Sequence, residues 1–499
     1  PPAPPAYLDR LNAAQREAVL HGDGRVSGPL LIIAGAGTGK TNTLVHRLAH
    51  LVLRGADPRR MLLMSFSRRA AAEMIRRAER IAAEIQGAGA GLLTEGLIWT
   101  GTFHAVGARI LRDYAPVLGL EPDFTIQDRS DSADLMNLVR HRLGFSRAEK
   151  RFPRKETCLA IYSRAINAQA DLGEVLRQHF PWCADWEAEL GDLFGAYVEA
   201  KQASAVLDYD DLLLAWATML QSEEFAAEVG GRFDHVLVDE YQDTNRLQAS
   251  ILRALKPEGQ GVTVVGDDAQ AIYAFRAAEV RNILDFPAQF DPPARVIALE
   301  ENYRSTPEIL DAANAVLAEA REGYAKTLRS ERPRGGRPRL VTVRDEAGQV
   351  QHVCDEILAA RETGTLLKQQ AVLFRTAHHS GPLEVELTRR NIPFVKFGGL
   401  KFLEAAHIKD VLACLRFVQN PTDRIAGFRV LQLLPGIGPS TAERVLDGLA
   451  AARSAGDTLA TCPVPARAAE PWQEFCGVYG RLERGTAGWP RELDTVLDW

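Results

Sequence analysis

The chain has 499 residues, of which 46% are hydrophobic and 25% charged, and its formal net charge is −6. This composition is that of an ordinary soluble protein, and the length predicts several domains of roughly 100–200 residues each. The charge excludes a generally basic nucleic-acid-binding chain, so any such surface must come from local basic clusters.

The six cysteines are scattered and form no CxxC pair, so the sequence indicates neither a zinc site nor a disulfide framework. It contains no signal peptide and no apolar run long enough to cross a membrane. We therefore expect a reducing cytoplasm and no membrane contact. Because the chain begins at Pro1 and stops at Trp499, directly after a helix-like run, we also expect it to be cut from a longer protein.

Helices and strands alternate at the start of the chain. A short helix is predicted at 11–19, with Asn12 as its N-cap. Apolar runs at 30–33, 61–66 and 97–101 predict buried strands, and each leads into a helix-like run. This alternation favours a parallel α/β sheet.

The turn after the first strand has the pattern of a phosphate-binding loop. Its glycines let backbone N–H groups point at an anion, and the following helix turns its positive end toward phosphates. Lys40 can reach the β- and γ-phosphates, and the Thr41 hydroxyl can hold Mg²⁺. The alternative is an ordinary glycine-rich turn. The predicted nucleotide-binding residues are Ala34, Gly35, Ala36, Gly37, Thr38, Gly39, Lys40 and Thr41.

Between about 106 and 230 the pattern becomes mostly helical, as expected of an insertion between strands. This region contains a basic cluster with two interleaved phenylalanines, which is either a solvated helix face or a DNA-contacting face. The members of the cluster are Phe145, Arg147, Lys150, Arg151, Phe152, Arg154 and Lys155.

The strand pattern resumes with apolar runs at 233–238, 262–266 and 295–299. A second α/β unit is predicted from about residue 300. It is expected to contain a helix at 306–319, strands at 339–343 and 370–375, and a helical pattern from 397 onward.

The strand at 233–238 ends in Asp239-Glu240, which resembles the second half of a nucleotide hydrolysis site. Asp239 can hold the Mg²⁺ that Thr41 also binds, and Glu240 can take a proton from the attacking water. An acidic pair after a strand is common as plain surface. Its combination with an upstream phosphate loop favours hydrolysis.

Several stretches carry motifs in a fixed order and span nearly the whole chain, and with them the chain resembles the UvrD/Rep/PcrA-type superfamily 1A DNA helicases. Ala34 is the residue that this family usually carries at the start of its phosphate loop. Two departures are Arg68-Arg69 in place of Asn-Lys, and Phe275 where the family often has Trp. The stretches are 11–15, 65–74, 101–104, 207–213, 239–245, 265–276, 301–305 and 397–404.

The resemblance implies an α/β fold with two RecA-like P-loop domains, the second incomplete, interrupted by two mostly helical insertions. The expected boundaries are 1–105 and 231–298 for domain 1A, 106–230 for insertion 1B, 299–396 for the first part of domain 2A and 397–499 for a truncated insertion 2B.

For the nucleotide site, the resemblance implies ATP with Mg²⁺. Gln15 would read the adenine edge, and Tyr303 would stack on the base. Arg304 and Arg276 would neutralise charge on the γ-phosphate. Gln270 would lie between the γ-phosphate and the DNA and couple the two sites.

For the DNA site, the resemblance implies single-stranded DNA and junctions with duplex DNA. Candidate residues for stacking on bases are Phe66, Tyr273 and Phe275, although buried core positions are the alternative. Backbone phosphates would contact Arg68, Arg69 and Thr102, whereas His104 would either join them or pack. The glycines of the 435–438 turn, Gly436 and Gly438, resemble a helix–hairpin–helix that presents N–H groups to duplex phosphates, or form a plain helix-ending turn.

The implied activity is that of an ATP-dependent 3′→5′ DNA helicase or single-stranded DNA translocase in DNA repair or replication. We expect a bacterial, nucleoid-associated protein that meets repair or replication proteins and is a monomer or weakly self-associating. Two late family motifs, one with a γ-phosphate arginine, are absent. The chain alone is therefore expected to be a poor ATPase that does not unwind DNA.

Three alternatives remain at this point. One is a nuclease-coupled relative of the RecB/AddA type. Another is a non-motor ATP-binding module that regulates access to DNA, which the presence of both Asp239 and Glu240 disfavours. A small-molecule kinase would explain Gln15 but leaves the 270–276 stretch without a role.

Overall fold

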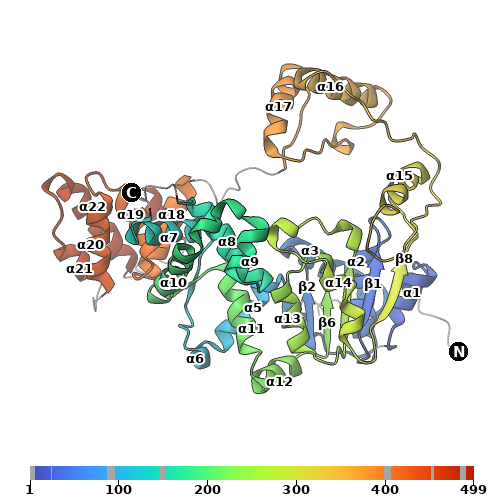
Figure 1. Cartoon of the computed structure of the whole chain (residues 1–499), viewed down its shortest axis with the longest axis horizontal. Coiled ribbons are helices and arrows are strands. Elements are labelled where there is room, and N and C mark those ends of the chain that lie inside the picture. Colours follow the sequence, from blue (N-terminus) through green and yellow to red (C-terminus); the bar gives the residue numbers. More distant parts are fainter. Residues whose placement is uncertain are drawn as a thin grey trace. The chain divides into compact units, whose positions relative to one another are not determined.

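The computed structural model describes residues 6–23, 25–86, 96–145, 152–397, 406–450, 455–483 and 490–499. The chain divides into two compact units, Pro1–Arg337 and Pro338–Trp499. Figure 1 colours the elements of both units along the sequence. Among the described helices, none combines the length and the apolar character that a membrane crossing requires.

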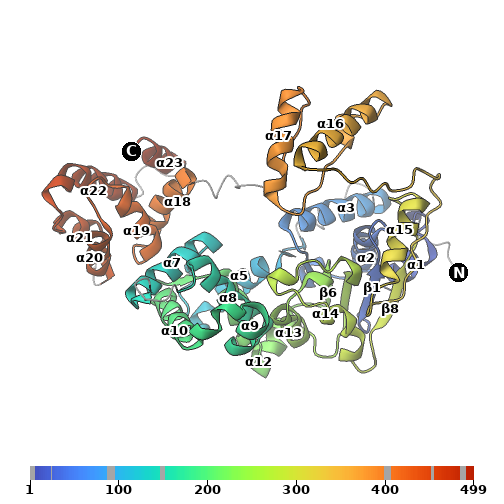
Figure 2. The same ribbon diagram turned by 45° about the horizontal axis from the view of Figure 1, so that its top comes forward.

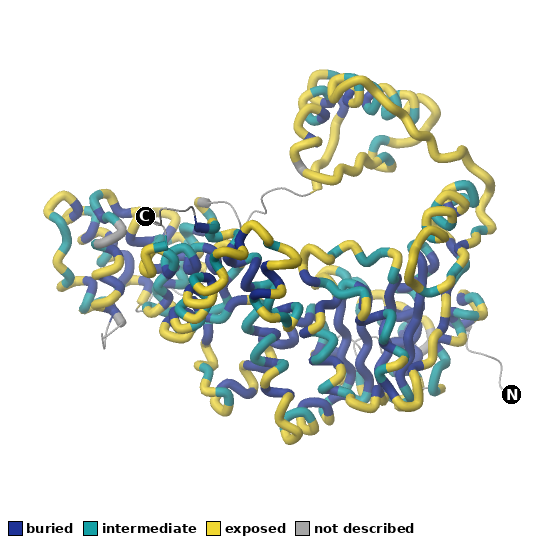
Figure 3. The backbone as a smooth tube through the Cα atoms, in the orientation of Figure 1, coloured by how far each residue is buried: buried dark blue, intermediate teal, exposed yellow. Residues whose placement is uncertain are grey.

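The first unit is built on a six-stranded sheet with strand order β3-β2-β6-β7-β1-β8, in which all neighbours are parallel. The four inner strands are buried along their whole length, as a parallel sheet covered on both faces requires (Figure 3). All six strands were predicted from the sequence and are confirmed. They are β1 (Leu30–Ala34), β2 (Met61–Met64), β3 (Trp99–Gly101), β6 (His235–Val238), β7 (Val262–Gly266) and β8 (Arg295–Leu299).

Alternate residues of each strand enter two separate hydrophobic cores, because successive side chains of a strand point to opposite faces. Leu30 and Ile32 of β1 join one core, whereas Leu31 and Ile33 join the other. Figure 2 shows α3 and α13 on opposite sides of the sheet. The first core contains α1 (Ala13–Leu20), α2 (Lys40–Leu53) and α3 (Arg68–Gln86), and the second α5 (Phe103–Asp113), α11 (Tyr209–Met219), α13 (Arg246–Leu255) and α14 (Arg281–Leu284).

The predicted helical region between β3 and β6 is also confirmed. Lys201 is buried there and donates hydrogen bonds to Asp208 and Asp211 at 2.8 and 2.7 Å. Asp208 also forms a capping box with Asp211 at the start of α11, so this acidic stretch has a structural role. The other elements are α6 (Ala115–Leu118), β4 (Thr125–Ile126), α7 (Arg129–Arg142), α8 (Lys155–Ala168), α9 (Leu172–His179), α10 (Glu187–Ala203), β5 (Val206–Leu207) and α12 (Glu223–Gly231).

The basic cluster of this region is only partly described. Phe145 and Phe152 stack on each other with ring centroids 4.8 Å apart, and Phe152 is buried, so its ring packs inside the protein. Lys155 forms an ion pair with Asp134, and Arg154 precedes α8. The remaining members, Arg147, Lys150 and Arg151, lie outside the described residues.

The second unit is helical in all its described regular elements apart from short 3₁₀ turns. A small core centred on Val350, Cys354 and Leu383 joins α16 to α17, and a larger one around Phe417 and Tyr479 joins the later helices. The bounds are α16 (Glu346–Glu362), α17 (Ser380–Arg389), α18 (Ala406–Gln419), α19 (Arg424–Leu433), α20 (Pro439–Ala450), α21 (Ala455–Thr461), α22 (Ala469–Glu483) and α23 (Arg491–Leu497).

The strands predicted at 339–343 and 370–375 are wrong. Both segments are irregular and largely exposed (Figure 3). Leu340 and Leu373 are 94% and 93% exposed. A strand exists only through hydrogen bonds to a neighbour, and the described part of the second unit contains no paired strand. The helix predicted at 306–319 is confirmed as α15 (Pro307–Leu317) of the first unit.

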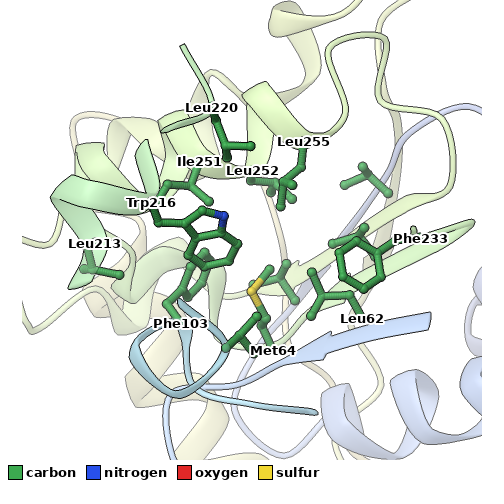
Figure 4. Packing of buried hydrophobic residues seen from close by; sticks show 14 of the residues in the cluster. Leu62, Met64, Phe103, Leu213, Trp216, Leu220, Phe233, Ile251, Leu252 and Leu255 are labelled. Atoms are coloured by element: carbon green, nitrogen blue, oxygen red, sulfur yellow. The ribbon is translucent and has the colours of Figure 1, made fainter. Parts of the chain in front are cut away.

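Trp216 on α11 is fully buried in the second core, beside Phe103 (Figure 4). We expect Trp216→Ala to lower the free energy of unfolding by about 3–5 kcal/mol, because a large ring leaves a cavity. Urea denaturation followed by circular dichroism measures this change. The matched control is Trp182→Ala, since Trp182 is 71% exposed, with an expected change within about 0.5 kcal/mol. Equal changes in the two variants would contradict the assignment of this core.

Candidate nucleotide and DNA sites

The predicted phosphate loop connects β1 to α2 at the edge of the sheet where the carboxyl ends of the strands meet. Gly37 and Gly39 have φ values of 81° and 85°, in the left-handed region that favours glycine. The Thr38 hydroxyl donates to the Gly35 carbonyl at 2.8 Å and so closes the turn. Lys40 is the first residue of α2, so the positive end of the helix faces the loop.

A hydrogen-bonded ion pair joins the phosphate loop to the acidic pair after β6. Lys40 is buried, and its Nζ donates to Glu240 Oε2 at 2.9 Å across 200 residues of sequence. Glu240 itself has a φ of 54°, in a left-handed conformation that is uncommon for a residue with a side chain. The Lys40 ammonium therefore has a carboxylate partner at the place where a phosphate loop binds phosphates.

Asp239 has the chemistry of a metal ligand. It is buried, and burial followed by the Glu240 charge raises its pKa to about 7. Its Oδ1 atom has no hydrogen-bond partner among the described residues. A hard divalent cation supplies such a partner and favours the ionised carboxylate, so Asp239 and the Thr41 hydroxyl fit Mg²⁺. Within the described residues no cluster of three His, Cys, Asp or Glu could hold a metal.

The predicted adenine-binding residues lie beside the phosphate loop. Gln15 is buried, accepts a hydrogen bond from the Asn12 backbone N–H and donates to the Thr38 carbonyl at 2.9 Å. Both functions of its amide therefore bond within the protein, and adenine would have to share or replace these bonds. The Tyr303 hydroxyl accepts from Asn12 Nδ2 at 3.0 Å, and the Tyr303 ring is half-exposed.

The segment 300–305, which contains Tyr303 and Arg304, is hydrogen-bonded to the phosphate loop. The Tyr303 N–H donates to the Gly37 carbonyl at 2.9 Å, and Asn302 Nδ2 donates to the Ala36 carbonyl at 2.5 Å. A Cβ on Gly37 would lie 2.6 Å from the Arg304 Cβ, so the close approach requires glycine. The predicted phosphate-contacting arginine is thus next to the phosphate loop.

A chain of hydrogen bonds leads from Lys40 to Gln270. Glu240 Oε2 accepts from Gln242 Nε2 at 2.8 Å, and Gln242 Oε1 accepts from the Asp267 backbone N–H at 3.0 Å. Gln270 Nε2 then donates to Asp267 Oδ2 at 2.6 Å. Gln270 therefore reaches the ion pair of the phosphate loop through two intervening residues, the Gln242 side chain and the carboxylate and backbone N–H of Asp267.

The three predicted stacking residues come together, although Phe66 follows β2 whereas Tyr273 and Phe275 follow β7. The ring centroids of Phe66 and Tyr273 lie 4.7 Å apart, and those of Tyr273 and Phe275 lie 5.6 Å apart. Phe66 is 43% and Phe275 70% exposed, so these rings are not core residues. The Arg276 guanidinium lies over the Tyr273 and Phe275 rings rather than against the phosphate loop. Its predicted contact with the γ-phosphate stays a prediction.

The remaining DNA candidates of the first unit differ in character. Arg68 and Arg69 are exposed at the start of α3. Thr102 caps α5 by accepting a hydrogen bond from the Ala105 N–H. His104 packs edge-on against Tyr209, and burial lowers its pKa to about 4. His104 is therefore neutral at pH 7 and offers no positive charge to a phosphate.

The glycine turn of the second unit lies between α19 and α20. Gly436 has a φ of 90°, and the Ile437 N–H donates to the Leu434 carbonyl at 3.1 Å. The Gly438 carbonyl accepts from the N–H groups of the first turn of α20. The turn thus joins two helices, as the predicted helix–hairpin–helix requires. Most of the motif stretch at 397–404 lies outside the described residues.

Sequence reasoning missed three residues that contact this site or the loops that carry it. Asn12 was predicted only as a cap, but it also contacts Tyr303. Gln242 lies inside a motif stretch that gave it no separate role. Lys326 is buried against Asp267 and Asp268, and nothing in its sequence neighbourhood distinguishes it from a surface lysine.

The parallel sheet, the phosphate loop and the acidic pair together define a RecA-like P-loop protein. Comparison with models of known protein families shows which P-loop family the chain belongs to. Residues 11–291 match the model of the UvrD/REP helicase N-terminal domain, and residues 297–456 match that of the UvrD-like helicase C-terminal domain. The chain belongs to the UvrD/Rep helicase family.

Proteins similar to the chain in sequence include bacterial proteins named ATP-dependent DNA helicases. The chain is 33% identical to PcrA of Staphylococcus epidermidis over 88% of its own length, and 36% identical to PcrA of Leuconostoc citreum over 87%. It is 37% identical to UvrD1 of Mycobacterium tuberculosis over 86%. The matches cover 58%, 56% and 56% of these relatives, so the chain spans little more than half their length.

The raised pKa of Asp239 predicts a pH-dependent stability. Its folded-state pKa of about 7 exceeds the ordinary 3.8, so the folded chain keeps a proton that the unfolded chain has lost. Stability therefore falls from about pH 4 up to the folded-state pKa near 7 and levels off above it, and about 1.4 kcal/mol of this loss falls between pH 6 and pH 8 without divalent cations. We expect Asp239→Asn to remove this loss, as measured by urea denaturation in EDTA.

Asp243→Asn is the matched control for this measurement. Burial raises the pKa of Asp243 to about 6, so its own stability loss ends about one pH unit lower, and Asp243→Asn should keep most of the loss between pH 6 and pH 8. Identical pH profiles for the original chain and Asp239→Asn would contradict the raised pKa.

Proposed function

We propose that the chain is the motor part of an ATP-dependent DNA helicase that binds Mg²⁺-ATP and moves along single-stranded DNA. One observation carries this proposal. The hydrogen-bonded chain from Lys40 to Gln270 ends three residues before Tyr273, in the loop that carries Tyr273 and Phe275. This link supports a nucleotide site and a base-stacking surface at one edge of one sheet.

In the nucleotide site, an incoming phosphate would compete with Glu240 for the Lys40 ammonium. Release of Glu240 from this ion pair would free its carboxylate to orient the attacking water and accept its proton. Thr41 and Asp239 would hold Mg²⁺, which neutralises phosphate charge. Arg304 would stabilise the charge that develops on the γ-phosphate.

In the DNA site, Phe66, Tyr273 and Phe275 would stack on successive bases. Stacking contributes about 1–3 kcal/mol per base and tolerates any sequence, because every base has a π-face. Arg68 and Arg69 would contact the DNA backbone. In the second unit, the turn with Gly436 and Gly438 would offer N–H groups to duplex phosphates.

The finer points of the proposal rest on the family. Movement in the 3′→5′ direction, a role in repair or replication and action on DNA in the bacterial cytoplasm are supported by the motif resemblance. The named relatives support ATP dependence and DNA as the substrate.

Binding measurements on the purified chain test the proposal. We expect Lys40→Ala to weaken binding of a fluorescent ATP analogue with Mg²⁺ at least tenfold, because the ammonium no longer meets the phosphates. Affinity for a dT oligonucleotide without nucleotide should stay unchanged. Equal nucleotide affinity in both proteins would contradict the assignment of the phosphate loop.

The complementary variant is Phe275→Ala. We expect about a tenfold loss of affinity for the dT oligonucleotide, which corresponds to one stacked base. ATP affinity should be kept. Trp182→Ala, which removes another exposed aromatic of the same unit, is the control and should change neither affinity. Unchanged DNA binding in Phe275→Ala would exclude the aromatic surface as the DNA site.

A further inference from the structure

Residues 323–329, which we call the strap, follow α15 and pack against the loop after β7. The Tyr324 N–H donates to Asp268 Oδ2 at 3.1 Å, and its hydroxyl donates to the Ile283 and Leu284 carbonyls. A Cβ on Gly323 would lie 2.6 Å from Asp268 Oδ2, so the strap approaches this loop closely.

Lys326 is the central contact of the strap. Its side chain is 3% exposed, and its Nζ donates to Oδ1 of Asp267 and of Asp268, both at 2.5 Å. Both carboxylates are themselves largely buried. Without the ammonium, two buried like charges would face each other without a cation, which is strongly unfavourable.

The other end of the strap contacts the phosphate loop. A Cβ on Gly35 would lie 2.4 Å from Leu328 Cδ2, so the leucine side chain packs directly on the loop. The Leu328 N–H donates to Asn314 Oδ1 at 3.0 Å, and Asn314 Nδ2 donates to the Leu328 carbonyl at 2.8 Å. The Asn302 N–H donates to the Arg329 carbonyl at 2.7 Å.

Asp267 is therefore the point where two connections from the phosphate loop meet. One runs from Lys40 through Glu240 and Gln242 to the Asp267 backbone N–H. The other runs from Gly35 along the strap to Lys326 and the Asp267 carboxylate. The second oxygen of that carboxylate binds Gln270, which lies three residues before Tyr273.

We propose that Lys326 is a positioning residue that couples the nucleotide site to the DNA-binding loop through the strap. This inference rests on the proposed function. Lys326 is not among the residues proposed to contact nucleotide or DNA; its ammonium donates to Asp267 and Asp268. It fixes Asp267, and thereby Gln270 and the base of the aromatic loop, relative to the phosphate loop. A phosphate that draws Lys40 from Glu240 changes the hydrogen bonds that run through Gln242 to the Asp267 backbone. Because Lys326 holds the Asp267 carboxylate, this change is passed to Gln270 and so shifts the loop that carries Tyr273 and Phe275.

The quantity to measure is the coupling factor. This is the ratio of the dissociation constants for a fluorescent dT oligonucleotide without and with a non-hydrolysable ATP analogue and Mg²⁺. Coupling between two sites is typically 5- to 150-fold, and it is equal in both directions. We expect a factor of this size for the original chain, and a factor near 1 for Lys326→Met, with each separate affinity kept within about threefold.

Two further variants keep the test independent of folding. Lys326→Arg retains the charge and should retain coupling. Lys326→Met combined with Asp268→Asn leaves one buried carboxylate without a cation instead of two, so it should recover part of the melting temperature lost in Lys326→Met but leave the coupling factor near 1. Full coupling in this folded double variant, or in Lys326→Met, would overturn the proposal.

Lys201 provides a matched control, because it too is buried between two aspartates of the same unit. Lys201→Met combined with Asp211→Asn should lower stability and leave the coupling factor unchanged. Loss of coupling in this control as well would overturn the proposal, since any buried lysine would then have the same effect. If the original chain binds both ligands with a coupling factor of 1, this inference fails alone. If it binds neither ligand, the proposed function fails.

Discussion

The ion pair between Lys40 and Glu240 is the interaction on which the arrangement of the site depends. The two residues lie 200 positions apart, and β7 separates their strands in the sheet. They meet because all six strands are parallel, so every loop at a carboxyl end reaches the same edge. The helices between β3 and β6 also contact this edge, since Arg164 of α8 donates to the Ala274 carbonyl at 3.1 Å.

The same geometry concentrates carboxylates at one point of this edge. Asp239, Glu240 and Asp243 follow one strand, and burial raises the pKa of Asp239 and of Asp243. Lys40 compensates only part of this charge, because Nζ contacts Glu240 alone among these carboxylates. A divalent cation would relieve the repulsion, and a phosphate would find Lys40 already positioned and desolvated.

The sequence predicted those features that depend on local pattern. An apolar run such as 30–33 indicates a buried strand, and glycine at 37 and 39 supplies the left-handed backbone that the turn requires. Pairing across the chain was harder to predict. The 339–343 and 370–375 runs have the strand pattern but no partner among the described residues. Nothing local indicated that the Gln15 amide bonds the Thr38 carbonyl or that Lys326 is buried.

The aromatic surface of Phe66, Tyr273 and Phe275 has a consequence for selectivity. Ring faces bind the faces of bases, whereas sequence is encoded in the hydrogen-bonding edges of base pairs. A chain that holds DNA in this way would treat every stretch of single strand alike. Where such a protein acts along a genome must then be decided by the form of the DNA, such as a junction or a gap.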